Sequence, residues 1–343
     1  MRAILIDEHG GAEKLRYVED FPMPQPAIGE VRVRVRAAAL NRLDLWVRDG
    51  WAGIKLPLPH ILGADAAGEI DALGESVQGL AVGDRVVLNP GIGCGRCDLC
   101  LSGQENLCQK FGILGEDMHG TYAEYVVVPA RNALKLPDQV SYAQAAAAAL
   151  VYLTAWHSLI RRGGLRAGES VLIVGAGGGV NSASIQIAKL AGATVYVVAS
   201  TAEKAAQALA LGADAAIDRS AEDWVRAIFQ RTERRGVDIV VDNVGKATIN
   251  GSIRAVKRGG KILIVGNTSG YDSEIDLRYL FAKHISLIGS TMANHADFVQ
   301  VMRLIFEGKL TPLISARYPL AEARQAHERL AQGDVFGKII LEV

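Results

Sequence analysis

Cysteine is scarce in this sequence: the 343 residues contain four, and all four lie between Cys94 and Cys108. They are spaced Cys-x2-Cys-x2-Cys-x7-Cys, and four thiolates this close together can surround one Zn²⁺ in a tetrahedron that leaves no position for water or substrate. Disulfide bridges, which are typical of short secreted chains, and four unpaired thiols are the alternatives. The spacing therefore predicts one structural zinc, held by Cys94, Cys97, Cys100 and Cys108, and it leaves no cysteine for a catalytic metal.

An excess of charge and long hydrophobic runs are also absent. Lysine and arginine together number 37, as do aspartate and glutamate, so the formal net charge is zero and no basic stripe points to nucleic acid or to a membrane surface. The apolar segments are interrupted before the length of about 20 residues that crosses a bilayer. The first six residues are typical of a strand inside the fold rather than of a signal peptide. These absences predict a soluble, cytoplasmic protein that acts on a small molecule, without nucleic-acid or membrane partners.

The pattern of apolar residues changes near residue 150. Before this point the chain is rich in Gly and Pro and contains short alternating runs, such as valine and arginine over 31–36, which predict half-buried strands. After it, short apolar runs alternate with helical segments, which is typical of a parallel sheet with helices on both faces. The predicted fold class is α/β, with a β-rich domain over 1–148 that includes a cysteine lobe at about 91–110, a doubly wound domain over 149–285, and a return segment over 286–343 that packs partly on the first domain.

A glycine-rich segment follows the first predicted strand of the second domain and leads directly into a predicted helix. It reads Gly175-Ala176-Gly177-Gly178-Gly179-Val180. Glycines permit a tight turn and a close approach of the backbone to a pyrophosphate, whose negative charge is stabilised at a helix N-terminus. Between a strand and a helix, the segment predicts a dinucleotide-binding loop, and a glycine-rich turn without a ligand is the alternative.

The end of the next strand indicates which dinucleotide is bound. A carboxylate there would bond the ribose 2′-hydroxyl of NAD and would repel the 2′-phosphate of NADP. The sequence instead places Ser200 and Thr201 at this end, Lys204 one turn into the following helix, and Arg219 after the third strand. Hydroxyl and cationic groups can hold a phosphate, which favours NADP(H) over NAD(H). In the alternative interpretation, Ser200 caps the helix and the two cations are solvated surface charges.

Together these features resemble the medium-chain dehydrogenase/reductase superfamily over essentially the whole chain. The cysteine lobe is similar to that of the zinc alcohol dehydrogenases. The segment that resembles the quinone oxidoreductases instead reads Gly168-Glu169-x2-Leu172-x3-Ala176-Gly177-Gly178-Gly179-Val180-Asn181-x4-Gln186-x2-Lys189. It departs from their pattern at Asn181, where a glycine is expected. The resemblance implies a GroES-like N-terminal domain followed by a Rossmann dinucleotide-binding domain.

The resemblance to the zinc alcohol dehydrogenases ends at the catalytic metal. The positions of the three zinc ligands and of the hydroxyl that relays the alcohol proton are occupied here by Asn41, Ala64, Leu150 and Leu43. The pattern Asn41-x2-Asp44-x3-Arg48-x-Gly50 instead resembles zinc-independent quinone reductases and related enoyl reductases. A substitute metal site that uses His60 and Asp65 is the alternative.

The resemblance implies delivery of hydride from NAD(P)H to an electron-poor acceptor, a quinone or an α,β-unsaturated carbonyl. Without zinc and the hydroxyl relay, alcohol oxidation has no evident base. Asn41 is expected to orient the substrate or the nicotinamide, Thr154 matches a family position beside the nicotinamide, and Asp44 is expected to fix Arg48 or the local backbone. Three aromatic residues are candidates for an apolar acceptor pocket or for the core: Trp46, Trp51 and Tyr152.

Two other functions are compatible with the sequence. One is a zinc-containing NAD(P)-dependent alcohol dehydrogenase, and the other is a non-catalytic NADPH-binding redox sensor. Family members usually associate through an edge strand of the dinucleotide domain, and residues 285–290 form a suitable edge. A homodimer or a homotetramer is therefore expected.

Overall fold

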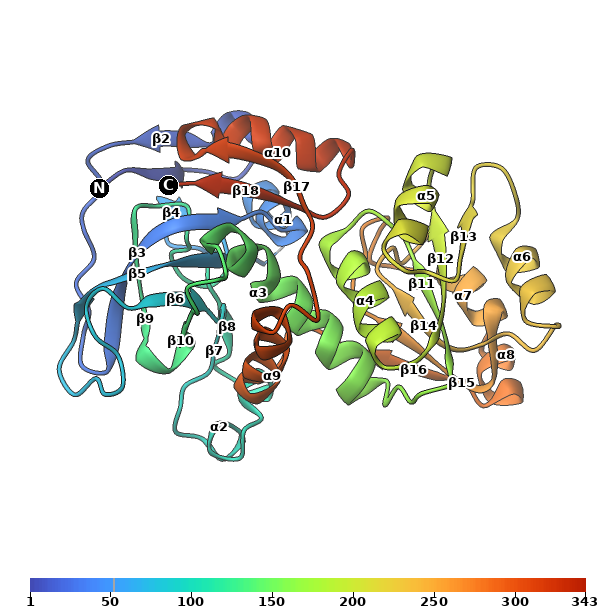
Figure 1. Ribbon diagram of the computed structural model, residues 1–343. Coiled ribbons are helices and arrows are strands. Elements are labelled where there is room, and N and C mark those ends of the chain that lie inside the picture. Colours follow the sequence, from blue (N-terminus) through green and yellow to red (C-terminus); the bar gives the residue numbers. More distant parts are fainter. Residues whose placement is uncertain (52) are drawn as a thin grey trace. The chain divides into compact units, whose positions relative to one another are not determined.

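The computed structural model describes residues 1–51 and 53–343, which divide into two compact units. The first unit consists of Met1–Leu153 and Met292–Val343, and the second consists of Thr154–Thr291. Helix α3 (Tyr142–Trp156) contains the point at which the chain passes from the first unit to the second (Figure 1). The segment after residue 291 belongs to the first unit, so this unit is built from both ends of the chain.

The first unit is organised around a sheet of short strands, with helices at its margins. Its elements, besides α3, are β1 (Ala3–Ile6), β2 (Arg16–Val18), β3 (Glu30–Ala39), α1 (Arg42–Asp49), β4 (His60–Ile61), β5 (Asp65–Leu73), β6 (Arg85–Leu88), β7 (Gly91–Ile92), α2 (Asp98–Leu101), β8 (Gly112–Ile113), β9 (Tyr125–Pro129), β10 (Ala133–Lys135), α9 (His295–Phe306), β17 (Ile314–Pro319), α10 (Ala323–Gln332) and β18 (Lys338–Glu342). The order in the main sheet is β10-β6-β5-β3-β18-β17, and β9 pairs with β3.

Strand β3 shows why the alternating sequence forms a half-buried strand. The valines at 31, 33 and 35 are buried in the core of the first unit, while the arginines between them point to the other face. Arg32 pairs there with Asp71 at 2.5 Å, and Arg36 pairs with Glu69 at 2.8 Å, both on β5. The period of two therefore separates core from surface, and ion pairs between neighbouring strands cover the polar face.

The second unit is a doubly wound parallel sheet. Its elements are a π-helical turn (His157–Arg162), β11 (Ser170–Val174), α4 (Gly179–Leu190), β12 (Thr194–Ala199), α5 (Ala202–Ala210), β13 (Ala215–Asp218), α6 (Trp224–Arg231), β14 (Val237–Asp242), α7 (Ile249–Ala255), β15 (Val256–Ile264), α8 (Leu277–Lys283) and β16 (Ser286–Gly289). The strand order is β13-β12-β11-β14-β15-β16, and every pair is parallel. Helices α4 and α5 lie on one side of this sheet, with α6 and α7 on the other (Figure 1). The predicted fold class is confirmed.

One helical segment, Tyr142–Arg162, is long and apolar enough to cross a membrane by length and composition. The expectation that every apolar segment is interrupted before spanning length is therefore wrong for this segment, because alanines and leucines run through α3 with few charges. However, 78% of its most apolar window is buried inside the protein, as in the core helix of a folded domain.

The C-terminal strand brings the last residues of the chain to the middle of the first unit. Strand β18 pairs antiparallel with β3, with Ile340 opposite Ala39, while Ala39 is also opposite Asp65 on β5. Lys338 lies two residues before Ile340 and Asn41 lies two residues after Ala39, so the antiparallel pairing brings Lys338 beside Asn41. Three segments that are far apart in the sequence therefore meet at one end of the sheet.

Candidate active site

The candidate site in the first unit is a buried cluster of Asn41, Asp65 and Lys338. The Lys338 ammonium donates to Asp65 Oδ2 at 2.9 Å and to Asn41 Oδ1 at 2.5 Å. The Asn41 amide nitrogen donates to Asp65 Oδ2 at 2.9 Å, and it also lies 3.4 Å from the Ala39 carbonyl. All three side chains are at least nine-tenths buried. A buried carboxylate is stable only when it is paired and hydrogen-bonded, and here it is both.

By the sequence resemblance described above, Asn41 stands at the expected position of one ligand of a catalytic zinc. Ala64, the residue before Asp65, stands at the expected position of another. The backbone N–H of Leu150, at the third ligand position, donates to Asp65 Oδ1 at 2.8 Å. Both oxygens of Asp65 are therefore engaged by protein groups, and the positive charge beside them belongs to Lys338.

The alternative metal site is not formed by the described part of the chain. His60 uses Nε2 on the Gly115 carbonyl at 3.1 Å, and its ring stacks obliquely on His119. Among residues 1–51 and 53–343, the four cysteines are the one group of three or more His, Cys, Asp or Glu side chains close enough together to bind a metal. His60 and Asp65 belong to no such group.

Asp44 fixes the backbone at the start of α1, as expected, but it does not bond Arg48. Its Oδ2 accepts from the Asn41 backbone N–H and from the Tyr122 hydroxyl, each at 2.7 Å. Arg48 instead pairs with Asp49 at 2.6 Å and donates to the Gly10 carbonyl. Helix α1 ends at Asp49, and its C-cap residue Gly50 has φ +77° and leaves no room for a side chain against His9. In the contacts that the structure describes, Asp44, Arg48 and Gly50 of the predicted motif therefore hold the backbone around α1 in place.

The remaining candidates differ in accessibility. Trp46 and Trp51 are exposed, whereas Tyr152 is buried and donates to the Thr311 carbonyl at 2.9 Å, as expected of a core residue. Thr154 is buried on α3, and its hydroxyl has no hydrogen-bond partner among the described residues. A helical threonine usually bonds a carbonyl of the preceding turn. The Thr154 hydroxyl is therefore available to a ligand.

The four cysteines of the lobe come together as the spacing predicts. Their sulfur atoms all lie within 4.8 Å of one another, and none forms a disulfide. The backbone N–H groups of Arg96 and Cys97 lower the pKa of the Cys94 thiol to about 6, whereas burial raises the pKa of the Cys100 thiol to about 12. The Lys110 N–H donates to Cys108 Sγ at 3.3 Å. The residues present fit a structural zinc.

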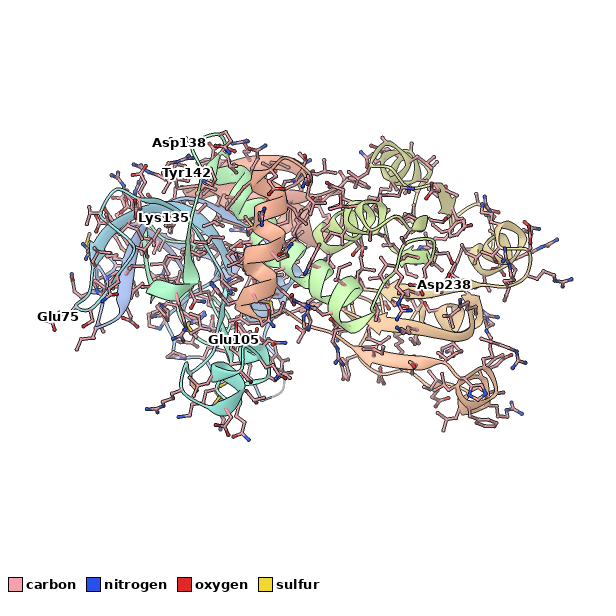
Figure 2. All side chains as sticks on the ribbon, turned by 60° about the horizontal axis from the view of Figure 1, so that its bottom comes forward. Glu75, Glu105, Lys135, Asp138, Tyr142 and Asp238 are labelled. Carbon is pink, nitrogen blue, oxygen red and sulfur yellow. The ribbon has the colours of Figure 1, made fainter. Side chains whose placement is uncertain are left out.

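The cysteine lobe is bonded to the first turn of α9. Glu105, labelled in Figure 2, accepts from the His295 backbone N–H. Asn294 donates to the Gly103 carbonyl at 2.8 Å. On the other side, Arg131 donates to the Gly93 carbonyl at 2.7 Å. The lobe is thus part of the framework of the first unit.

The glycine-rich loop lies between β11 and α4, as predicted. Gly175 has φ +99°, a conformation that favours glycine, and Gly178 is the N-cap of α4. The first turn of a helix leaves backbone N–H groups without intrahelical partners, and these suit a phosphate. The loop follows β11, beside the point between β11 and β14 where the strand order reverses and where ligands of such sheets bind. The loop therefore fits a dinucleotide.

The residues predicted to recognise the adenosine ribose lie at the ends of β12 and β13. The helix cap is Thr201 rather than Ser200: its hydroxyl accepts from the Lys204 N–H at 3.2 Å. The Arg219 backbone N–H donates to the Ala199 carbonyl at 3.0 Å, so Arg219 follows β13 beside the end of β12, with its side chain exposed. Neither residue directly after β12 is acidic.

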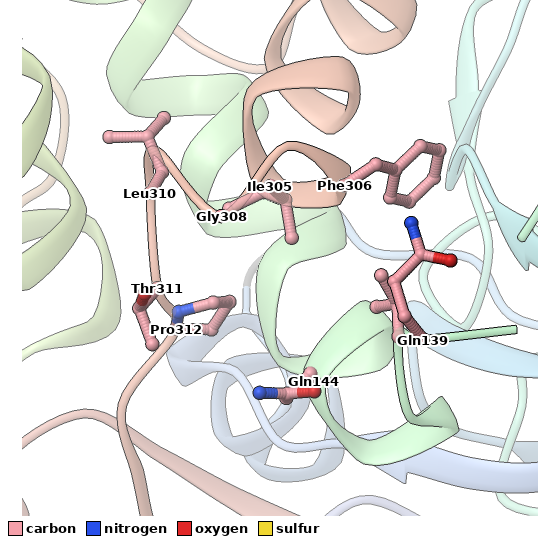
Figure 3. A pocket seen from close by; sticks show the side chains of 9 residues that line it. Gln139, Gln144, Ile305, Phe306, Gly308, Leu310, Thr311 and Pro312 are labelled. Carbon is pink, nitrogen blue, oxygen red and sulfur yellow. The ribbon is translucent and has the colours of Figure 1, made fainter. Parts of the chain in front are cut away.

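A hollow of about 160 Å³ elsewhere in the first unit does not contain the candidate site (Figure 3). It is lined by residues from the start of α3, the end of α9 and the segment that follows α9, including Gln139, Gln144, Phe306 and Pro312. None of the residues predicted for catalysis, cofactor or metal lines it.

Comparison with known proteins places this arrangement in a family. Residues 27–138 match the alcohol dehydrogenase GroES-like domain, and residues 179–307 match the zinc-binding dehydrogenase domain. The chain is 46% identical to a solved NAD-dependent alcohol dehydrogenase, over 100% of both chains and with a TM-score of 0.97. It is 32% identical to acryloyl-coenzyme A reductase of Metallosphaera sedula, over 99% of both, and 30% identical to quinone oxidoreductase of Homo sapiens, over 99% of this chain and 97% of the relative.

The chain belongs to the medium-chain dehydrogenase/reductase superfamily. It is therefore an oxidoreductase, and the expected resemblance and fold are confirmed. The names of these relatives cover alcohols, a conjugated thioester and quinones, so they leave the substrate open. The solved relative is named NAD-dependent, and the comparisons do not support the predicted preference for NADP(H).

Sequence reasoning missed Lys338 in this dehydrogenase/reductase. Lys338 is the first residue of a strand whose next three residues are apolar. A lysine at the end of a strand is ordinarily exposed to solvent, so the sequence offered no reason to place it in the core. A signal was present, because a carboxylate at Asp65 inside an apolar strand requires a positive partner. Which of the 37 lysines and arginines supplies it depends on the strand pairing.

Protonation of His60 is expected to make the stability of this oxidoreductase depend on pH. Burial lowers the pKa of His60 from 6.5 to about 4. Between these values the unfolded chain binds a proton that the folded chain does not, so stability is lost as the pH falls from 6.5 towards 4. We expect His60→Gln, which keeps a donor for Gly115 but does not titrate, to reduce the loss of unfolding free energy between pH 7 and pH 5 by about 2 kcal/mol, measured by urea unfolding.

Two carboxyls, one buried and one half-buried, act in the opposite direction. Burial raises the pKa of Asp44 to about 6 and that of Glu116 to about 7, so both favour the folded state as the pH falls. Because both groups are present in the wild type and in the variant, their effects cancel in the comparison. Equal losses of stability in the two proteins would contradict the role given to His60.

Proposed function

We propose that this chain is an NAD(P)H-dependent reductase that delivers hydride to a quinone or an α,β-unsaturated carbonyl without a catalytic zinc. The observation that carries the proposal is the Lys338 ammonium bonded to Asp65 and Asn41, at the place of the metal ligands. A Zn²⁺ ion there would have to displace a cation that is buried, paired and doubly hydrogen-bonded. The similarity to a quinone oxidoreductase and to acryloyl-coenzyme A reductase supports the same class of acceptor.

The chemistry follows from what the site lacks and what it holds. Zinc makes an alcohol easy to oxidise by lowering the pKa of the bound oxygen, and a Ser or Thr would relay the proton where this chain has Leu43. A quinone or a conjugated carbonyl is already electrophilic, so it needs orientation and a hydrogen-bond donor for the oxygen that gains charge. A reduced nicotinamide, when bound, supplies the hydride.

The side chains divide into positioning and donor groups. The Asn41 amide is engaged by Lys338 and Asp65, so its role is to hold the ion pair, and Asp44 holds the backbone N–H of Asn41. Thr154 is the candidate donor to the nicotinamide or the acceptor, because its buried hydroxyl has no partner among the described residues. A buried hydroxyl without a partner is unfavourable, and a ligand oxygen or amide would satisfy it.

The dinucleotide is held by the glycine-rich loop and the first turn of α4, and we infer that the enzyme accepts both NADH and NADPH. No carboxylate at the end of β12 repels a 2′-phosphate. At the same time, Thr201 uses its hydroxyl to cap α5, which leaves fewer groups for a phosphate than the sequence suggested. The solved NAD-dependent relative supports the use of NADH.

A second copy of this chain is the proposed partner in solution. Strand β16 is the last strand of the parallel sheet and pairs only on its β15 side among the described residues. Leu287 on this strand is 38% exposed. An unpaired edge of this kind is suited to antiparallel pairing with the same edge of another protomer, which gives a homodimer or a homotetramer.

The test is a panel of acceptors and donors measured with the purified protein and its zinc content. We expect turnover of quinones or enones with NADH and with NADPH, with kcat/KM values for the two cofactors within about tenfold, and one zinc per chain. Alcohol oxidation that is faster than enone reduction, together with two zinc ions per chain, would favour the alcohol dehydrogenase instead. Tight binding of NADPH without turnover of any acceptor would favour a redox sensor.

A further inference from the structure

The residue that departs from the family pattern in the dinucleotide loop carries a side-chain amide with an unused donor. Asn181 lies in the first turn of α4 and is 6% exposed. Its Oδ1 accepts from the side-chain amide of Asn243, in the segment after β14. Its Nδ2 has no hydrogen-bond partner among the described residues. This nitrogen is not one of the fully buried polar atoms that lack a partner, so it can be reached from outside the protein and is free to donate to a ligand.

The amide is directed into the glycine-rich loop. Side chains on a helix lean towards its N-terminus, so Asn181 covers the turn that precedes it. Asn181 Nδ2 lies 2.6 Å from the position that a Cβ atom on Gly175 would occupy, and 3.7 Å from the corresponding position on Gly178. Gly175 is therefore required here to make room for the amide, besides allowing the positive φ of the turn.

The orientation of the amide is fixed by a second layer of bonds. Asp242, at the end of β14, is fully buried and accepts from the backbone N–H groups of Val244 and Gly245. It also accepts from the hydroxyls of Thr248 and Ser252. These bonds hold the segment that carries Asn243, whose NH₂ group occupies the oxygen side of the Asn181 amide. The nitrogen side is left facing the loop.

We propose that Asn181 is a cofactor-binding residue, whose Nδ2 donates a hydrogen bond to the pyrophosphate of the bound dinucleotide. The inference rests on the dinucleotide site of the proposed function and adds a side-chain donor to the backbone donors of the loop. A phosphate oxygen is a strong acceptor, and a loop whose glycines bring it close to the backbone also brings it close to this amide. Asn181 thereby takes a binding role at a position where the family pattern has a glycine.

The test uses ADP-ribose, which has the pyrophosphate but no nicotinamide, and measures its Kd by calorimetry for the full-length protein. We expect Asn181→Asp to weaken binding at least 30-fold, because a carboxylate replaces the donor and repels the phosphates while still accepting from Asn243. An acidic residue in the first turn of a helix is favourable, so the fold is expected to persist, which thermal unfolding without ligand checks. Asn181→Gly, which restores the family residue, should weaken binding about fivefold to tenfold.

Asn250→Asp is the matched control, because it adds the same charge to the second unit on an exposed residue of α7. This variant should bind ADP-ribose within twofold of the wild type. Wild-type affinity in both Asn181 variants would overturn the inference and leave the proposed function intact. A wild-type protein that does not bind ADP-ribose would overturn both.

Discussion

Removal of the metal from the cysteine lobe is expected to unfold the lobe and to lower the Tm of the protein by about 10 °C. The lobe has no core of its own: α2 has four residues, none of them buried, and strands β7 and β8 have two residues each. Of the four cysteines, only Cys108 is buried. A bound zinc would therefore supply most of the energy that keeps these turns in place.

The loss is expected to spread from the lobe to α9 through Glu105 and Asn294. Cys100→Ser, or prolonged chelation, should release one zinc per chain, lower the Tm, and increase hydrogen exchange in residues 91–110 and in the first turn of α9. Ser102→Ala, an exposed substitution in the same lobe, is the control and should leave both unchanged. A metal-free protein with the wild-type Tm would contradict a structural zinc.

Lys338→Met is expected to destabilise the protein by about 3–5 kcal/mol, because it leaves the Asp65 carboxylate buried without a counter-charge. Lys338 and Asp65 side chains are 4% and 0% exposed, so solvent cannot replace the missing partner. Asp65→Asn should cost a similar amount by stranding the ammonium. The measurement is the free energy of unfolding in urea at pH 7.

A double-mutant cycle separates the pair from the two residues. We expect Lys338→Met combined with Asp65→Asn to be less destabilising than the sum of the single changes by at least about 2 kcal/mol, since the double variant buries no charge. Lys309→Met is a matched control, because Lys309 pairs with Glu307 at 2.8 Å on the surface and should cost less than about 1 kcal/mol. Additive single effects would show that the two charges do not depend on each other.

The zinc content of the same variants tests whether the site can hold a metal. If the ammonium of Lys338 takes the place of the metal charge, the wild type should contain one zinc per chain. The Lys338→Met variant should not gain a second zinc. Asn41 and Asp65 alone offer too few soft or imidazole ligands to hold zinc in a tetrahedral site.

The sequence predicted features that depend on neighbouring residues. The glycine-rich loop, the cysteine spacing and the period-two pattern of β3 are each contained in a short segment, and each was found in the structure. The cap of α5 shows the limit of such predictions. The sequence offered Ser200 as the capping residue, whereas in the structure the neighbouring Thr201 uses its hydroxyl for the cap. The predicted preference for NADP(H), which rested on both hydroxyls, on Lys204 and Arg219 and on the missing carboxylate, was not supported.

By itself, the sequence determined that this chain has two kinds of domain and one set of four cysteines. These four thiolates would fill the coordination shell of a zinc ion, and no further cysteine is left for a catalytic zinc. Only the tertiary structure decided what occupies the place of the zinc ligands. Asn41, Asp65 and Lys338 are 24 and 273 residues apart along the chain, and antiparallel pairing of β18 and β5 with β3 brings them together. A buried carboxylate must have a partner, but strand register selects that partner, and register is a property of the whole sheet.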